Sequence, residues 1–288
     1  MPVAHNGEVE LHYEQFGDPG HPTLLLVNGL GSQCINYPPE WCEMFCDEGY
    51  AVVRFDNRDV GLSSKLPDVD YALADMAGDA IAVLDAVGAE RAHVMGCSMG
   101  GMIVQRLAID HPDRLLSVTS VMSRTGEPGF GDSSEEALTL LMTPPPPERS
   151  AYIERQVEAL HVYGSKPEWL DDEAIRQRAA AAYDRCFCPD GIVRQMKAVG
   201  RDGSRSEQLA LVDLPVLVLH GSRDTLIDPS GGRRTAELIP GASYVEIEGM
   251  GHDYPPPVWR QWVDIWAEFA RGAEPGAARA GKGAQAPS

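Results

Sequence analysis

Short apolar runs recur along the chain at the spacing of a layered α/β sheet. Residues 8–16 alternate apolar and polar positions, which is typical of a strand with one buried face. Four later runs are almost continuously apolar, as expected of parallel strands covered on both faces: residues 23–28, 51–55, 92–96 and 215–219. Apolar positions at helical spacing lie between and after them, most clearly over 73–87 and 258–270. The alternation predicts an α/β fold with a mostly parallel central sheet and helices on both faces.

One long stretch lacks this alternation of strand and helix patterns. Residues 125–208 contain no convincing core strand, and four consecutive prolines at 144–147 precede alanine-rich helical patches. We therefore expect a helical lid insertion at 125–208, with residues 1–124 and 209–271 forming one core domain. A set of packing helices that contact no ligand is the alternative.

Composition and charge narrow the classes of partner. The 288 residues are 43% hydrophobic, which is ordinary for a globular protein, and the formal net charge is −19. An acidic surface repels phosphate groups, so neither nucleic acid nor an anionic membrane is an expected partner. The start of the chain resembles no secretory leader and no apolar run of about 18 residues occurs, so we expect a cytoplasmic protein with reduced thiols. Residues 272–288, rich in Gly, Ala and Pro, are predicted to be a disordered tail. The sequence does not indicate an oligomeric state.

The candidate chemistry begins at Ser98, the centre of the sequence GCSMG. This pattern alone is weak evidence, but a predicted strand at 92–96 precedes it and a helical stretch at 100–109 follows. A serine on such a sharp strand-to-helix turn has a strained backbone and an exposed Oγ, and flanking glycines relieve the crowding. We expect Ser98 to be a nucleophile. A tight turn without chemistry is the alternative, and the neighbouring Cys97 does not occupy the central position.

A serine hydroxyl needs a base to take its proton and an acid to orient that base. His252 follows the predicted strand 243–248, and Asp224 lies in the loop after another strand. Loops that follow parallel strands gather at the carboxyl edge of the sheet, where ligands bind. Ser98, Asp224 and His252 are therefore expected to meet at that edge as a catalytic triad.

Two other carboxylates compete with Asp224 for the role of the acid. Asp228 lies four residues later and stays an alternative. Asp253 adjoins His252 and is too close in sequence to orient its neighbour's ring easily. Three other histidines follow Ser98: His111 just past the next helical stretch, His161 in the predicted lid, and His220 at the end of the strand before the Asp224 loop.

The oxyanion of a tetrahedral intermediate needs two N–H donors. One is expected from the backbone of Met99, directly after the nucleophile, and the other from Leu30 in the loop NGLG over residues 28–31. Asn28 and Gly29 of this loop are expected to border the substrate. An ordinary glycine-rich turn is the alternative.

Large side chains of the predicted insertion are candidates to line a substrate pocket, although such residues more often belong to a core. The candidates are Phe130, Met142, Tyr152, Tyr163, Trp169, Tyr183 and Phe187. Asp56 and Arg58 are expected to brace the loop beside the oxyanion site through an ion pair.

These motifs, spread over roughly residues 8–270, resemble the α/β-hydrolase superfamily in kind and order. The segments DNRDVGLS at 56–63 and GMGH at 249–252 are similar to those of the bacterial aclacinomycin methylesterase group, which hydrolyses a methyl ester on a polyketide. The resemblance implies an α/β-hydrolase fold and a carboxylic ester hydrolase that needs neither cofactor nor metal and acts on a small ester. Asn28 stands where many relatives have His, which alters the polar edge of the pocket.

The predicted reaction proceeds through an acyl-enzyme on Ser98. A lactonase, a carbon–carbon bond hydrolase or a perhydrolase would use the same triad, so these remain alternatives. A non-catalytic receptor for a small apolar ligand on the same scaffold is an alternative from another class, and the complete triad argues against it.

Overall fold

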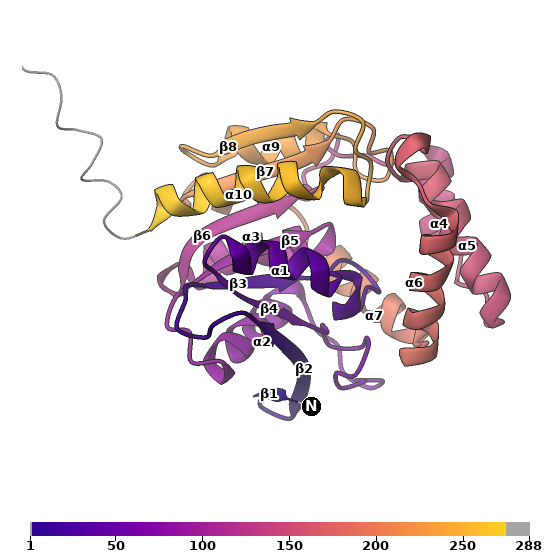
Figure 1. Cartoon of the computed structure of the whole chain (residues 1–288), viewed down its shortest axis with the longest axis horizontal. Coiled ribbons are helices and arrows are strands. Elements are labelled where there is room, and N and C mark those ends of the chain that lie inside the picture. The colour runs from indigo at the N-terminus through magenta and orange to yellow at the C-terminus, as the bar shows by residue number, and fades with distance from the viewer. Residues whose placement is uncertain (1, 275–288) are drawn as a thin grey trace, which may run out of the picture.

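The computed structural model describes residues 2–274, and an eight-stranded sheet forms its centre (Figure 1). The strand order is β1-β2-β4-β3-β5-β6-β7-β8. The first pairings, β1 with β2 and β2 with β4, are antiparallel, and all the others are parallel. The strands are β1 (Val3–Asn6), β2 (Val9–Phe16), β3 (Thr23–Val27), β4 (Ala51–Phe55), β5 (Ala92–Cys97), β6 (Leu115–Val121), β7 (Val216–Gly221) and β8 (Ser243–Ile247). The predicted mostly parallel sheet is confirmed.

Alternation along each central strand supplies both faces of the sheet with apolar side chains. On β3, Leu25 and Val27 join one core cluster, and Leu24 and Leu26 join the other. Successive side chains of a strand point to opposite faces, so a continuously apolar strand must be covered on both. The first core packs under α2 (Leu73–Ala86), α3 (Met99–Asp110) and α9 (Ser230–Leu238), and the second under α1 (Pro39–Asp47) and α10 (Trp259–Ala273).

Strand β6 was not among the predicted strands, because hydroxyl side chains interrupt its apolar pattern. Ser117, Thr119 and Ser120 are nevertheless buried in the sheet. The Ser117 hydroxyl lies 2.7 Å from Nδ1 of His93, and the Ser120 hydroxyl accepts a hydrogen bond from Gln105. A buried hydroxyl that finds a partner carries little penalty, so Ser117 and Ser120 look polar in the sequence yet belong to the core. The Thr119 hydroxyl is buried without a hydrogen-bond partner in residues 2–274.

The connection between β6 and β7 contains five α-helices and no strand among the described residues. They are α4 (Glu135–Met142), α5 (Arg149–Tyr163), α6 (Asp172–Arg185), α7 (Pro189–Asp202) and α8 (Ser206–Leu209). Figure 1 shows α4, α5 and α6 as a layer beside the sheet. Ala198 and Leu209, from α7 and α8, are fully buried in the first core cluster, so the end of this connection is part of the core packing.

The shorter elements and the chain ends complete the description. Four 3₁₀ turns lie at Cys34–Asn36, Pro112–Arg114, Pro167–Trp169 and Pro256–Val258. Helix α10 continues through Ala273, so the first residues of the predicted tail are helical, and residues 275–288 lie outside the described residues. Among the described residues no helix combines the length and apolar character needed to cross a membrane.

Two arginines of the helical connection anchor it to the loop after β4. Arg185 of α6 pairs with the buried carboxylate of Asp56 at 2.7 Å, and Arg194 of α7 pairs with the buried Asp59 at 2.7 Å. The expected Asp56–Arg58 pair is wrong, because Arg58 instead pairs with Asp79 on α2 at 2.6 Å. The partner of Asp56 therefore comes from a helix distant in sequence.

Replacement of Arg194 by Met is expected to lower the free energy of unfolding by about 3 kcal/mol, because it leaves the buried Asp59 carboxylate without its cation. Arg149→Met is the matched control. Its pair with Asp184 is half exposed and screened by solvent, so its loss should change stability little. Urea unfolding of both variants measures the difference, and equal losses would contradict an anchoring role for Arg194.

Candidate active site

Ser98 lies at the junction of β5 and α3 with φ 57° and ψ −119°. Non-glycine residues seldom adopt a positive φ, and such a conformation costs on the order of 1–3 kcal/mol. The surroundings hold it in place: the Ser98 N–H donates to the carbonyl of Val121, and the Ser123 hydroxyl donates to the carbonyl of Ser98. The sharp turn predicted for the serine is thus present.

The glycines on either side of Ser98 allow β5, α3 and β3 to approach closely. A Cβ on Gly96 would lie 2.0 Å from the carbonyl oxygen of Gly100, and a Cβ on Gly100 would lie 2.1 Å from the carbonyl oxygen of Val27. Both contacts are with backbone, which cannot move aside without opening the sheet. The crowding inferred from the glycine pattern is confirmed.

Gly100→Ala is expected to destabilise the protein by about 3 kcal/mol or more, because the new methyl group overlaps the backbone of β3. The matched control is Gly200→Ala in α7, where no atom lies within 4 Å of the added carbon. Alanine is the better helix former there, so this variant should gain roughly 0.5–1 kcal/mol. Thermal unfolding checks both, and similar stability of the two variants would refute the crowding argument.

Asp224 and His252 form a hydrogen-bonded pair after β7 and β8. The distance from Nδ1 of His252 to Oδ2 of Asp224 is 2.7 Å, and the aspartate side chain is fully buried. The other carboxylate oxygen accepts N–H groups of Leu226 and Ile227, both at 2.9 Å. With Nδ1 donating to the acid, Nε2 of His252 is left as the proton acceptor.

The charge on Asp224 follows from its neighbours. Burial by itself raises the pKa of this carboxyl group, but the charge and hydrogen bonds of His252 and the hydrogen bond of His220 outweigh burial and lower the pKa below its ordinary value. Asp224 therefore stays ionised and stabilises a positive charge on His252. That is the electrostatic arrangement which a base needs when it removes a proton from a neighbouring hydroxyl.

Neither of the competing carboxylates is bonded to the histidine ring. Asp228 is exposed, and it accepts the N–H of Ser230 at the start of α9. Asp253 accepts the N–H and the hydroxyl of Ser165. Of the three aspartates, the structure brings Asp224 to the ring of His252.

The turn after α5 fixes the histidine loop. The N–H of His252 donates to the carbonyl of Tyr163 at 2.7 Å, and the N–H of Gly251 donates to the hydroxyl of Ser165 at 3.0 Å. A Cβ on Gly251 would lie 2.1 Å from the backbone of Gly164. Sequence reasoning missed Ser165 and Gly164, and no local pattern marks them, because their partners lie more than 80 residues away.

The loop after β3 lies directly on the serine. A Cβ on Gly29 would come within 3.3 Å of Cβ of Ser98 and 3.9 Å of its Oγ. Gly31 has φ 67°, and its N–H donates to Gln195 of α7. Met99 opens α3, where geometry leaves the first backbone N–H groups without acceptors inside the helix. The two expected donors, Leu30 and Met99, thus belong to segments that flank Ser98.

The Asn28 amide points into the protein. Its side chain is 1% exposed and donates to the carbonyl of Phe55 on β4 at 3.1 Å. The backbone carbonyl of Asn28 accepts a hydrogen bond from the Asn57 side-chain amide at 3.0 Å. These bonds join the loops after β3 and β4, so the Asn28 amide that was expected to border the substrate is bonded inside the fold.

Tyr163 is the candidate pocket residue that reaches the triad. Its ring meets the His252 ring edge-on with centroids 6.0 Å apart. Burial raises the pKa of its hydroxyl to about 12, which keeps the phenol neutral. Trp169 lies against Gly249 of the same histidine loop and under the ammonium group of Lys166, 4.2 Å from the ring centre.

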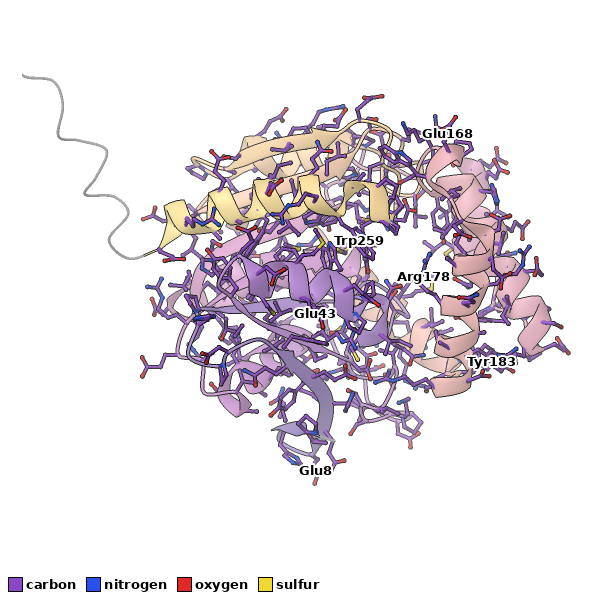
Figure 2. The ribbon with its side chains drawn as sticks, viewed as in Figure 1. Glu8, Glu43, Glu168, Arg178, Tyr183 and Trp259 are labelled. Atoms are coloured by element: carbon purple, nitrogen blue, oxygen red, sulfur yellow. The ribbon has the colours of Figure 1, made fainter. Side chains whose placement is uncertain are left out.

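The other pocket candidates lie in separate surroundings. Tyr183, near the end of α6 (Figure 2), donates to the carbonyl of Pro147 and clusters with Tyr152 and Phe187. Phe130 stacks with Arg234 of α9, 5.0 Å from the guanidinium carbon to the ring centre. Met142, at the end of α4, is 59% exposed. Within residues 2–274, no hydrogen bond, ion pair or aromatic contact joins these side chains to Ser98, Asp224 or His252.

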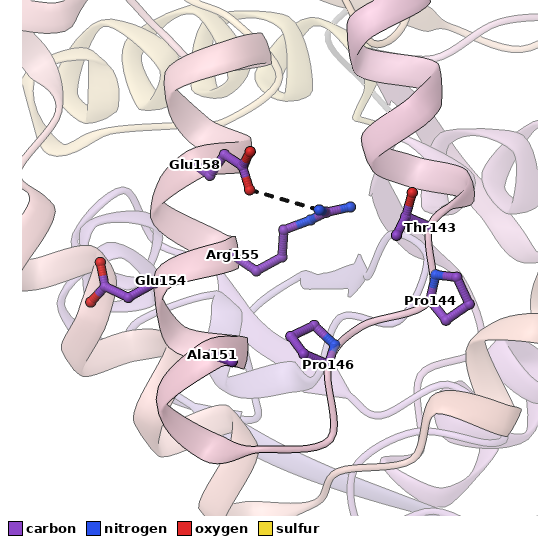
Figure 3. Close-up of a pocket in the computed structure, with 7 residues that line it drawn as sticks. All are labelled: Thr143, Pro144, Pro146, Ala151, Glu154, Arg155 and Glu158. Carbon is purple, nitrogen blue, oxygen red and sulfur yellow. Dashed lines mark ion pairs between the residues drawn. The ribbon is translucent and has the colours of Figure 1, made fainter.

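Two cavities border the helical connection. A small one of about 20 Å³ lies between the loop after β3 and the cluster of Tyr152, Tyr183 and Phe187, since Gly31 and Phe187 both line it. A larger one of about 580 Å³ lies between the proline run and α5 (Figure 3), where Arg155 and Glu158 form an ion pair at 3.7 Å. None of the residues that line the larger cavity belongs to the triad.

One buried cluster carries donor atoms that a metal ion could use, formed by His12, Cys34 and Asp56. Arg185 already occupies it: its guanidinium lies 2.7 Å from the Asp56 carboxylate and 3.4 Å from the Cys34 sulfur. A fixed cation on two of the three donors opposes a second cation, so the cluster does not fit a metal site.

Comparison with known proteins identifies the family to which the chain belongs. Residues 22–169 match the alpha/beta hydrolase fold family, just over half of the chain, and the chain belongs to this family. The predicted α/β-hydrolase fold is confirmed. An enol-lactonase from Burkholderia xenovorans LB400 has the same fold, with a TM-score of 0.77 and 22% identity over 93% of this chain and 99% of that one.

Within the family, the chain is similar to two methylesterases. It is 32% identical over 269 residues to the rhodomycin D methylesterase DauP of Streptomyces sp. (strain C5), which covers 86% of this chain and 90% of the relative. It is 33% identical over 274 residues to the rhodomycin D methylesterase DnrP of Streptomyces peucetius, covering 87% and 91%. The resemblance to the methylesterase group is confirmed.

Proposed function

We propose that this protein is a carboxylic ester hydrolase with Ser98, Asp224 and His252 as its catalytic triad. The observation that carries the proposal is the 2.7 Å bond between the buried Asp224 and His252, combined with the strained serine turn at the end of β5. Because β5, β7 and β8 run parallel, their following loops share one edge of the sheet. The similarity to two methylesterases supports the same reaction class.

The proposed reaction transfers an acyl group to water. Ser98 Oγ attacks the ester carbonyl while Nε2 of His252 takes its proton, and Asp224 stabilises the resulting imidazolium. The N–H groups of Leu30 and Met99 receive the oxyanion. His252 then protonates the departing alkoxide. Water, activated by the same histidine, releases the acid and restores Ser98.

We further propose a methyl ester of a polyketide-like or other small apolar molecule as substrate. The two relatives named for methylesterase activity support it, as does the Tyr163 ring beside His252. In this proposal residues 125–208 act as a lid over a core of residues 1–124 and 209–271. A cytoplasmic location fits the cysteines, none of which forms a disulfide among the described residues.

A hydrolysis screen tests the proposal. Methyl esters of flat aromatic acids, short-chain esters and lactones are offered to the native enzyme and to Ser98→Ala, and acid release is followed by titration. The proposal expects Ser98-dependent release, fastest with the aromatic methyl esters. Turnover of lactones alone would show a lactonase rather than an ester hydrolase. Absence of any Ser98-dependent turnover would contradict the proposal that the protein is an enzyme.

A further inference from the structure

His220 is a fully buried histidine outside the proposed triad, and its ring lies beside the carboxylate of Asp224. It occupies the end of β7, four residues before Asp224. Its Nε2 lies 2.9 Å from the carbonyl oxygen of Ile227 and 3.3 Å from Oδ2 of Asp224. That carboxylate oxygen is the one that accepts the hydrogen bond from His252.

The surroundings of His220 select one tautomer. A carbonyl oxygen only accepts hydrogen bonds, so Nε2 must carry the proton that it shares with Ile227. Nδ1 is buried without a hydrogen-bond partner in residues 2–274, and it faces Gly232, where a Cβ would lie 2.4 Å away. A proton on Nδ1 would be a buried N–H without an acceptor, which is costly. The geometry therefore selects a neutral ring protonated at Nε2.

We infer that His220 is a positioning residue for the catalytic acid, an inference that rests on the proposed triad. Its one N–H is donated to the carbonyl of Ile227, which ties down the loop whose Leu226 and Ile227 N–H groups hold the Asp224 carboxylate. The same Nε2–H dipole lies 3.3 Å from Oδ2 of Asp224. The two N–H groups of this loop and Nδ1 of His252 hold the carboxylate in place, with Oδ2 bonded to His252.

A neutral donor suits this role better than a charged one. A lysine or arginine in the same place would fix Asp224 equally well, but its charge would cancel the negative field that His252 uses when it becomes an imidazolium. The neutral His220 orients the carboxylate and leaves its charge available. Gly232 belongs to the same arrangement, because a larger residue there would displace the ring.

Kinetics of His220→Met and His220→Gln test the inference. Met fills a similar volume without a donor, so the Ile227 carbonyl loses its partner and the loop around Asp224 its anchor; kcat should fall about 10-fold, while KM changes less than about 2-fold. The side-chain N–H of Gln reaches the position of Nε2, so this variant should recover most of kcat. His93→Met is the matched control, since His93 is fully buried on β5 and bonds to Ser117 rather than to the triad.

Nitrogen NMR of the native protein labelled with ¹⁵N-histidine gives an independent test that needs no known substrate. The His220 signals, assigned by their absence from His220→Gln, should show a proton on Nε2 and none on Nδ1. A proton on Nδ1 would overturn the inference, as would a kcat for His220→Met equal to that of His93→Met, or no recovery with Gln. Failure of the triad itself would appear separately, as activity that survives in Ser98→Ala.

Discussion

Ser98→Ala is expected to lower kcat for ester hydrolysis on the order of 10⁶-fold, the loss seen when a triad nucleophile is removed. Without Oγ no acyl-enzyme forms, and what remains is binding and oxyanion stabilisation. The backbone around residue 98 should hold, because its bonds to Val121 and Ser123 use main-chain atoms of Ser98. Initial rates with a p-nitrophenyl ester, and circular dichroism to check folding, measure the effect.

Cys97→Ala is the matched control for this variant. Burial raises the pKa of the Cys97 thiol to about 12, so the side chain is a neutral core group rather than a second nucleophile. Its replacement should cost stability through a small cavity while kcat stays within about 3-fold of the native value. A large loss of kcat in Cys97→Ala together with a small one in Ser98→Ala would reverse the assignment.

Asp224→Asn is expected to lower kcat by about 10⁴-fold, because the amide nitrogen favours the wrong tautomer of His252. The charge that stabilises the imidazolium is lost as well, while the shape of the side chain stays the same. Asp228→Asn is the paired control: Asp228 is exposed and bonds to Ser230, so its kcat should stay within about 2-fold of the native value.

Steady-state rates at one pH compare the two aspartate variants directly. If Asp228→Asn lowered kcat more than Asp224→Asn, Asp228 would be the acid. The 2.7 Å hydrogen bond between Asp224 and His252 would then have no part in catalysis. If both were harmless, His252 would act without an orienting acid, which the triad account does not allow.

The parts of the site that the sequence predicts are those set by short-range pattern. An apolar strand followed by a glycine-flanked serine predicts the turn at Ser98, because crowding there acts between residues a few positions apart. The parallel strands predict that the loops carrying Asp224 and His252 share one edge, and the structure has these two residues in contact.

Contacts between distant segments could not be predicted in this way. The sequence suggested Arg58 as the partner of Asp56 because the two are near neighbours, but Arg185 comes from a helix that packs over that loop. Ser165 was missed as a support of the histidine loop for the same reason. It acquires this role only when the turn after α5 meets the loop after β8.

Pocket residues are the hardest to predict from pattern. Aromatic side chains at helical spacing look alike whether they face a ligand or a core. Of the candidates, Tyr163 meets His252, while Tyr183 packs in a cluster with Phe187 and Phe130 stacks on Arg234. The burial of each aromatic side chain and the direction in which it points decide between these roles. Both depend on how the helices between β6 and β7 pack.

Covalent labelling tests the central claim most directly. The native protein is treated with a fluorophosphonate, and the adduct is located by peptide mass spectrometry, with Ser98→Ala and His252→Ala treated in parallel. The account predicts one adduct per chain on the peptide that contains Ser98, slower labelling in His252→Ala, and none in Ser98→Ala. An adduct on another residue, or undiminished labelling of Ser98→Ala, would contradict it.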